Sequence, residues 1–120
     1  MHIHYISEQN SILNHFLAQI RDVNIQKDSM RFRKNIERIG EIMAYELSKT
    51  LDYKEIDVQT PLGIKHTTTI AEPVVLCSIL RAGLALHQGF MSFFDNAENG
   101  FVSAYRHHYD NDDKFEILVE

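Results

Sequence analysis

Two arginines each follow an apolar segment in the second half of the chain, and both residues could hold a phosphate or diphosphate. Arg81 comes directly after the apolar run 74–80, and Arg106 comes directly after the segment 101–105. A guanidinium can bind two phosphate oxygens at once through parallel N–H groups. Because the two segments are expected to be neighbouring strands, both arginines should lie at the same sheet edge, where open α/β sheets bind their ligands.

The residues after Arg81 strengthen the case for an anion site. Ala82 and Gly83 stand at the start of a helix predicted over 83–95, where backbone N–H groups are free and the helix dipole is positive. Gly83 would let a ligand approach the backbone closely. Two alternatives stay open: Arg81 could pair with a surface carboxylate while Gly83 only shapes the turn, and Arg106 could be a solvated charge at a strand end.

The histidines and the cysteine do not suggest a second chemistry. His107 and His108 are sequence neighbours that would face opposite ways on a strand, and they are expected in a loop. The remaining histidines are scattered or lack a third ligand, so no metal site is predicted. Cys77 lies inside the apolar run and is expected to be a core residue. The acidic residues Asp110, Asp112 and Asp113 are expected at a solvated loop tip.

The N-terminal half is predicted to contain an irregular arm, two helices and a hairpin. Residues 1–8 are expected to form the arm, and residues 11–22 have one apolar helical face after the capping pair Asn10-Ser11. A longer helix over 29–50 follows Asp28-Ser29, with apolar residues spaced by four, three, four and four. Alternating segments 55–60 and 64–70, joined by a Pro-Leu-Gly turn, indicate a hairpin.

A βαβ unit is predicted over residues 74–105. The almost unbroken apolar run 74–80 is typical of a strand covered on both faces, and the helix 83–95 leads from it to the strand 101–105. Such crossovers are right-handed, so the two strands should be parallel neighbours. A polar loop over 107–113 and a strand over 115–120 complete the chain. The predicted fold class is α/β.

Composition narrows the class of protein. The chain has 120 residues, enough for one domain, and a formal net charge of −5, which disfavours binding to nucleic acid. Its single cysteine excludes an internal disulfide and favours a reducing compartment. With no apolar run of membrane-spanning length and no signal-peptide pattern at the N-terminus, a cytoplasmic protein without membrane partners is expected.

Several strings resemble the N-terminal part of the uracil phosphoribosyltransferase family. They are Arg31-Phe32-Arg33, Ile39-Gly40-Glu41-Ile42, Thr60-Pro61-Leu62-Gly63, the run from Ile79 to Leu84, and Ser103-Ala104-Tyr105-Arg106. The resemblance runs over essentially the whole chain. It implies a type I phosphoribosyltransferase-like parallel sheet flanked by helices, with an N-terminal helical region (1–50), a β-arm (51–72), the βαβ unit (73–106) and a hood loop with a strand (107–120).

The resemblance also implies an activity. The family transfers ribose 5-phosphate from phosphoribosyl diphosphate to uracil, forming UMP and diphosphate in pyrimidine salvage, with Mg²⁺ bound through the substrate. Arg81, Ala82, Gly83 and Arg106 would bind the diphosphate, and both arginines would be catalytic. The loop 107–114 would close over the site. A homo-oligomer is expected.

Two motifs of the family do not occur in this sequence. They are the Asp-Pro-x-x-Ala-Thr-Gly loop, which holds the ribose phosphate, and the segment that reads uracil. The chain is therefore expected to be a truncated form that is inactive alone, with an exposed edge at the strand 74–80. The alternative is a non-catalytic fragment or an oligomerisation module of the same fold.

Overall fold

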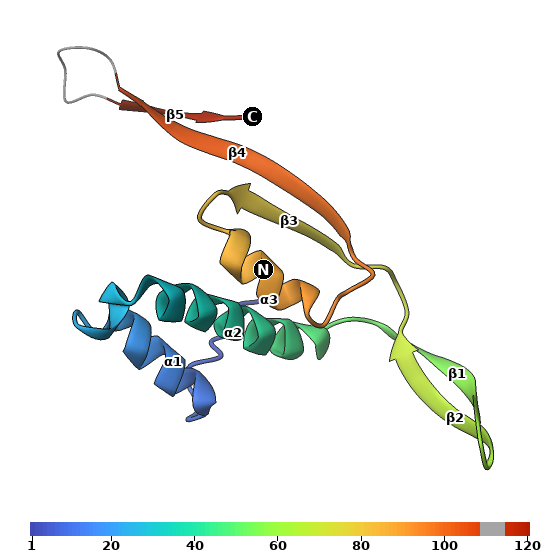
Figure 1. Ribbon diagram of the computed structural model, residues 1–120. Coiled ribbons are helices and arrows are strands. Elements are labelled where there is room, and N and C mark those ends of the chain that lie inside the picture. Colours follow the sequence, from blue (N-terminus) through green and yellow to red (C-terminus); the bar gives the residue numbers. More distant parts are fainter. Residues whose placement is uncertain (109–114) are drawn as a thin grey trace.

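The computed structural model describes residues 1–108 and 115–120, and for residues 106–108 and 115–116 it describes the backbone. It is a mixed α/β structure with helices packed on one of two small sheets (Figure 1). In chain order the elements are α1 (Ile12–Arg21), the 3-10 turn η1 (Ile25–Lys27), α2 (Ser29–Ser48), β1 (Tyr53–Thr60), β2 (Gly63–Ile70), β3 (Val75–Leu80), α3 (Leu84–Met91), β4 (Glu98–His108) and β5 (Phe115–Val119).

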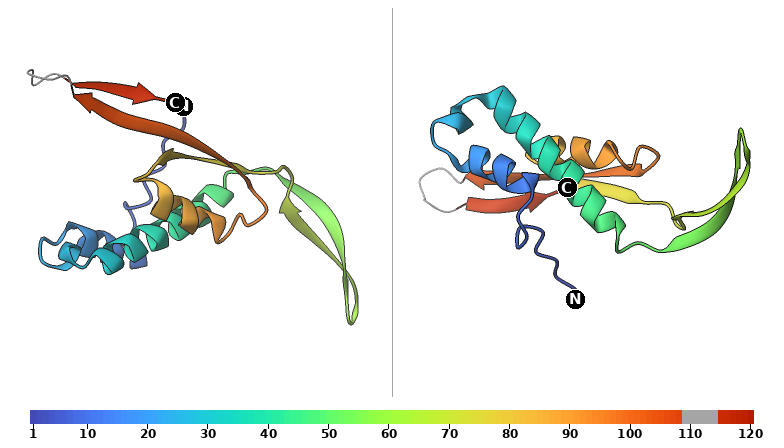
Figure 2. Two further views of the ribbon diagram at one scale, coloured as in Figure 1. Left: turned by 45° about the horizontal axis from the view of Figure 1, so that its top comes forward. Right: turned by 90° about the horizontal axis from the view of Figure 1, so that it is seen from below.

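The larger sheet has the strand order β3-β4-β5. Strand β3 pairs with β4 in parallel, from Val75 opposite Glu98 to Leu80 opposite Ser103, so the predicted βαβ unit is confirmed. Strand β5 pairs with β4 in the antiparallel sense. Helix α3 lies between this sheet and α2, and the helices therefore cover one face of the sheet (Figures 1 and 2).

The predicted N-terminal helices are confirmed together with their capping residues. The Ser11 side chain accepts a hydrogen bond from the Leu13 N–H at 3.2 Å, and Asp28 accepts one from the Arg31 N–H at 3.1 Å. Each cap satisfies a donor that has no partner within the helix. Residues 1–5 of the expected arm adopt no regular structure.

Helices α2 and α3 meet backbone to backbone through two glycines. A Cβ added at Gly89 would lie 2.1 Å from the Glu37 carbonyl oxygen, and one at Gly40 would lie 2.5 Å from the Leu86 carbonyl oxygen. Any side chain at either position would push the helices apart. This contact fixes the position of α3 relative to α2. Helix α3 directly follows the turn that contains Arg81.

The predicted hairpin is confirmed, with Thr60 opposite Gly63 across a two-residue turn. Gly63 has a φ of 134°, a conformation that other residues rarely adopt. The hairpin stands away from the body, and the molecule is 71 Å along its longest axis (Figure 2).

The core lies between α2, α3 and the beginning of β3, around Ala44, Leu76 and Phe94. Helix α3 ends at Met91 rather than at residue 95, because the chain turns there and buries Phe94 in this cluster.

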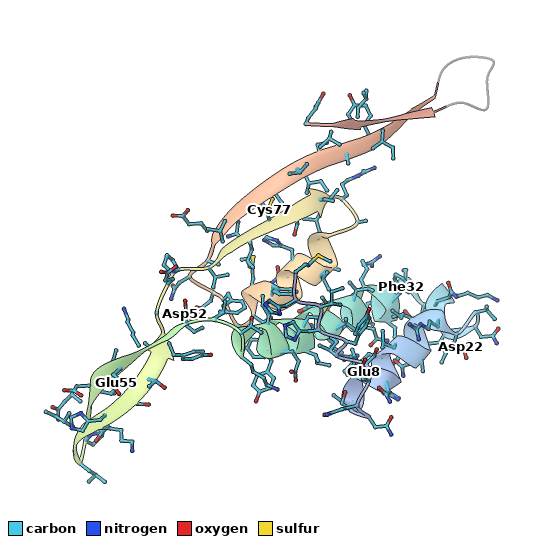
Figure 3. All side chains as sticks on the ribbon, turned by 180° about the vertical axis from the view of Figure 1, so that it is seen from behind. Glu8, Asp22, Phe32, Asp52, Glu55 and Cys77 are labelled. Atoms are coloured by element: carbon cyan, nitrogen blue, oxygen red, sulfur yellow. The ribbon has the colours of Figure 1, made fainter. Side chains whose placement is uncertain are left out.

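The prediction that β3 is covered on both faces is wrong. Leu76 is buried against the helices, but Val75 and Ile79 on the opposite face are 65% and 61% exposed. Cys77 shares that exposed face and is not a core residue, contrary to the prediction (Figure 3). An apolar pattern shows which residues of a strand could be buried, but not whether both of its faces are covered. Within the described residues, helices cover only one face of β3, and β4 pairs with one of its edges. Within the described residues β3 is an edge strand of its sheet, as predicted.

Strand β4 is longer than predicted in both directions. It begins at Glu98, because residues 98–100 pair with β3, and it continues to His108, because residues 104–108 pair with β5. Residues 107 and 108 are therefore strand, where a loop was expected. Most of the expected hood loop, 109–114, lies outside the described residues, as do Asp110, Asp112 and Asp113.

None of the helices in the described ranges has the length and apolar character needed to cross a membrane.

Candidate functional site

The turn from Arg81 to Gly83 connects β3 to α3 and folds back on the strand it leaves. The Gly83 N–H donates to the Ile79 carbonyl at 3.0 Å, and the Leu84 N–H donates to the Arg81 carbonyl at 3.2 Å. Two of the N–H groups that the sequence suggested were free are therefore used within the turn. The Ala82 N–H has no backbone acceptor among the described residues. The Leu80–Arg81 peptide bond is cis.

Gly83 is required by this close contact. A Cβ at Gly83 would lie 2.7 Å from the Ile79 carbonyl oxygen and 3.4 Å from the Ser78 Cβ. Its φ of −72° is open to any residue, so the requirement is steric. Gly83 thus shapes the turn, as the alternative interpretation held.

The Arg81 guanidinium is exposed and forms no ion pair with any described residue. The ion pairs of the described chain lie on α2 and its cap, and on the hairpin. The alternative in which Arg81 pairs with a surface carboxylate therefore finds no partner in this part of the chain. A free cation at the carboxyl end of a strand is available to an anionic ligand.

Arg106 lies on the neighbouring strand beyond the same edge. Leu80, the last residue of β3, is opposite Ser103, and Arg106 follows three residues later on β4, opposite Ile117. Because a strand rises about 3.3 Å per residue, the Arg106 backbone lies about 10 Å beyond Ser103 along β4. The backbone of Arg106 therefore lies beyond the same end of β3 as the turn that begins at Arg81.

Tyr105, the residue before Arg106 on β4, interacts with Glu120. The Tyr105 hydroxyl donates to the Glu120 carboxylate at 3.3 Å. The negative charge of Glu120 raises the pKa of Tyr105 above its ordinary value, with smaller contributions from burial and from the hydrogen bond itself. The hydrogen bond connects β4 to the residue that follows β5.

Sequence reasoning missed a buried polar group beneath the turn. His87 on α3 bonds to Ser78 through Nδ1 at 2.6 Å and to Asn99 through Nε2 at 2.7 Å. The available signal was a histidine within the apolar stripe of the helix predicted over 83–95. A polar residue in such a stripe needs partners on the surface that the stripe covers.

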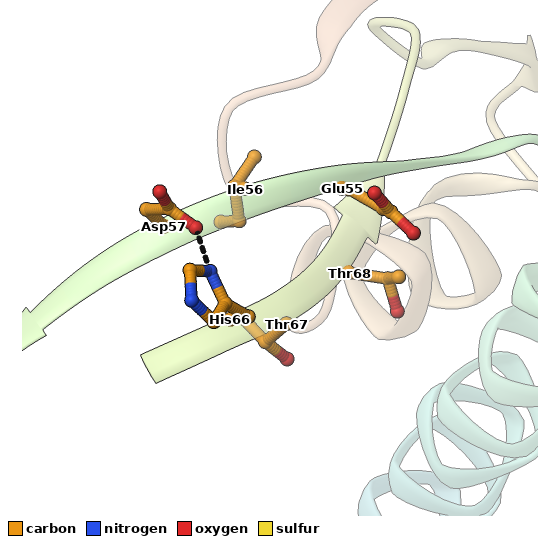
Figure 4. A pocket seen from close by; sticks show the side chains of 6 residues that line it. All are labelled: Glu55, Ile56, Asp57, His66, Thr67 and Thr68. Carbon is orange, nitrogen blue, oxygen red and sulfur yellow. Dashed lines mark hydrogen bonds and ion pairs between the residues drawn. The ribbon is translucent and has the colours of Figure 1, made fainter. Parts of the chain in front are cut away.

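A second candidate, on the hairpin, is a hollow of about 470 Å³ lined by Glu55, Ile56, Asp57, His66, Thr67 and Thr68 (Figure 4). His66 Nδ1 bonds to Asp57 there, but both side chains are largely exposed to water. An exposed pair is screened by solvent and gains little electrostatic strength. The hairpin that carries this hollow also lies beyond the start of β3, at the opposite end of that strand from the turn to α3 (Figure 1).

The comparisons with known proteins decide the family. The family model described as uracil phosphoribosyltransferase matches residues 6–117. The chain belongs to the uracil phosphoribosyltransferase family. A uracil phosphoribosyltransferase of Porphyromonas gingivalis is 48% identical over all 120 residues, and one of Sulfolobus acidocaldarius is 42% identical over 98 residues.

The chain spans about half the length of these uracil phosphoribosyltransferases. The alignments cover 55% of the Porphyromonas gingivalis protein and 44% of the Sulfolobus acidocaldarius protein. The fold is also similar to that of the AQ2163 protein from Aquifex aeolicus, with a TM-score of 0.67 at 22% identity over 94% of this chain and 53% of that one. The family assignment predicted from the sequence strings is confirmed.

The described residues hold no group of three or more histidine, cysteine, aspartate or glutamate side chains that could bind a metal ion. The donor set of the turn, a guanidinium and a backbone N–H, suits an anion and not a cation.

Proposed function

We propose that these residues form the diphosphate-binding part of a uracil phosphoribosyltransferase site, on a type I phosphoribosyltransferase-like sheet. The reaction would transfer ribose 5-phosphate from phosphoribosyl diphosphate to uracil, giving UMP and diphosphate. The observation that carries the proposal is the exposed Arg81 guanidinium, without a partner among the described residues, on a tight turn at the carboxyl end of a parallel strand. Because the chain belongs to the uracil phosphoribosyltransferase family, binding of a diphosphate group is the expected role of this turn.

In the proposed mechanism Arg81 binds the diphosphate group as it leaves. Cleavage of the bond between the sugar and the diphosphate places negative charge on the departing oxygens and positive charge on the sugar. A guanidinium already in place stabilises that charge most strongly in the transition state. Removal of one such donor typically costs about 3–4 kcal/mol, or a factor of 10²–10³ in rate.

The other groups of the proposed site have supporting roles. The Ala82 N–H would donate to a diphosphate oxygen, and Gly83 would keep side chains away from the ligand. Arg106 would supply a second positive charge from β4. Mg²⁺ would accompany the diphosphate as its counter-ion, held through substrate oxygens. Recognition of the ribose phosphate and of uracil would fall to segments other than these, because the corresponding motifs do not occur in residues 1–120.

A binding measurement tests this function. Titration calorimetry with magnesium diphosphate and with phosphoribosyl diphosphate should show saturable binding to the chain, and Arg81→Ala should weaken the affinity at least tenfold. Arg21→Ala is the matched control, since Arg21 is an exposed arginine on α1. Equal loss in both variants would mean general attraction to charge, and unchanged binding by Arg81→Ala would remove Arg81 from the site.

A second function is favoured by the projecting hairpin. The strands β1 and β2 stand clear of the body, with Tyr53, Val58, Leu62 and Ile64 between 39% and 100% exposed (Figure 1). We propose that this arm contacts a second copy of the chain, so that the protein forms a homo-oligomer. Light scattering at increasing concentration should give a mass above that of the 14.0 kDa monomer, whereas a constant monomer mass would exclude assembly.

A further inference from the structure

We propose that His87 is a positioning residue, which fixes α3 on the sheet and thereby sets the backbone of the Arg81 turn. The inference rests on the proposed function for what the turn binds. Among the side chains that the structure describes, the buried polar or charged ones are Asn35 and His87. Asn35 connects α2 to Gln19 of α1, whereas His87, 7% exposed, connects α3 to two strands.

The hydrogen bonds around the imidazole define its orientation. The Asn99 amide nitrogen donates to the Ala97 carbonyl at 3.1 Å, so the Asn99 amide oxygen faces His87 and accepts from Nε2. In the neutral ring Nδ1 is then an acceptor, and the Ser78 hydroxyl donates to it. Both ring nitrogens are satisfied by residues on adjacent strands, and a tilted contact with Phe101, 5.0 Å between ring centres, holds the ring from the side.

The same residues continue directly into the turn. The His87 N–H donates to the Gly83 carbonyl at 2.9 Å, and a Cβ added at Gly83 would lie 3.4 Å from the Cβ of Ser78, the hydroxyl partner of the imidazole. Ser78 therefore lies beside both the turn and the histidine. An apolar residue at position 87 could fill the space but could not define the height of α3 over the strands, because apolar contacts have no preferred direction.

A direct chemical role for this group is less favoured. Serine, histidine and asparagine in a row look like a nucleophile, a base and an orienting group. Asn99 offers a neutral amide oxygen, however, which would stabilise a protonated imidazole less than a carboxylate would. The ring is thus better arranged to hold its neighbours than to take a proton from Ser78.

The first experiment needs no ligand. Hydrogen exchange by NMR would compare the wild-type chain with His87→Leu, which removes both bonds, and His87→Gln, whose amide oxygen and nitrogen can replace the two ring nitrogens. The amide of Gly83 should exchange at least tenfold faster in His87→Leu and within threefold of wild type in His87→Gln. Gln88→Leu, at an exposed neighbouring position, is the control and should leave this amide unchanged.

The second experiment measures magnesium diphosphate binding by calorimetry. His87→Leu should weaken the affinity at least fivefold, and His87→Gln should stay within twofold of wild type. If wild type itself does not bind diphosphate, the proposed function fails while the exchange result still decides the positioning role. If diphosphate binds through Arg81 and His87→Leu leaves both the affinity and the Gly83 exchange unchanged, the positioning role is overturned.

A weaker variant guards against loss of folding in His87→Leu. Ser78→Ala removes one of the two hydrogen bonds and leaves the ring in place. It should accelerate exchange at Gly83 at least threefold, while the Phe32 amide at the start of α2 keeps its wild-type rate. Wild-type exchange at Gly83 in Ser78→Ala, with wild-type affinity for diphosphate, would contradict the proposal.

Discussion

At the scale of single residues, the proposed site depends on one exposed cation and on the small residue beside it. Arg81 carries its charge free of described carboxylates, and Gly83 lets the turn lie against β3. The two residues have separate tasks. Arg81 attracts the anionic ligand, and Gly83 allows the backbone turn that positions Arg81.

Gly83→Ala tests the second task. The added methyl group would meet the Ile79 carbonyl oxygen at 2.7 Å, so the turn must shift outward. We expect diphosphate affinity to fall at least fivefold with a loss of stability of about 1–3 kcal/mol, the usual range for overpacking. Calorimetry and urea unfolding measure the two effects. An unchanged affinity would mean that the ligand does not depend on this turn.

Tyr105 gives a prediction about pH. Its pKa is raised chiefly by the charge of Glu120, so Glu120→Gln should lower the Tyr105 pKa toward its ordinary value, as followed by NMR of labelled tyrosine rings. A pKa raised in the folded state contributes stability that is present below the unfolded pKa and is lost as pH rises through the folded value. The contribution should therefore disappear only in strongly alkaline solution. An unchanged Tyr105 pKa in Glu120→Gln would refute the assigned cause.

At the scale of elements, the position of α3 is decided by glycine on one side and by a polar bridge on the other. Gly40 and Gly89 bring α2 and α3 into backbone contact, and His87 connects α3 to the sheet. The helix is thus held from both sides along its 8 residues. These contacts therefore also fix the first turn of α3, which follows the Arg81 turn.

Gly89→Ala should be among the most damaging single substitutions. The Cβ would lie 2.1 Å from a main-chain oxygen, which cannot rotate away, so a loss of about 3 kcal/mol or more is expected. Gly100→Ala is the matched control, because its Cβ would have only ordinary contacts, the nearest at 3.7 Å to Cys77 Sγ. Thermal unfolding should place Gly100→Ala at or above wild type, and equal losses in both variants would contradict this account of the helix contact.

The elements were predictable where local pattern and capping agree. Helix α2 has a regular apolar spacing and an aspartate cap, and the hairpin has alternating residues around a glycine turn. The length of β4 was not predictable, because its last residues are polar and become strand only by pairing with β5. The two arginines could be placed from the order of strands, but the His87 bridge depends on contacts between three elements that no local pattern records.

At the scale of the whole molecule, the larger sheet has helices on one face and an open apolar surface on the other. Val75, Ile79, Ile117 and Val119 are each more than 60% exposed. An apolar surface of this kind favours association with another polypeptide surface. The chain aligns with 55% of the length of the Porphyromonas gingivalis relative.

The open face should be measurable through Cys77, the only cysteine in the chain. A thiol reagent should label Cys77 in the folded protein at no less than a tenth of the rate seen in denaturant, because the side chain is exposed on β3. Labelling slowed by a hundredfold or more would mean that this face is covered in solution. A labelling rate that falls as the protein concentration rises would show that a second copy of the chain covers this face.

The most direct test of the central claim is an NMR titration of the labelled chain with magnesium diphosphate. The largest amide shifts are expected at Ala82 and Gly83; they should saturate, and they should be lost in Arg81→Ala but kept in Arg21→Ala. Shifts centred on the hairpin around His66, or an absence of saturable shifts at the turn, would contradict that claim.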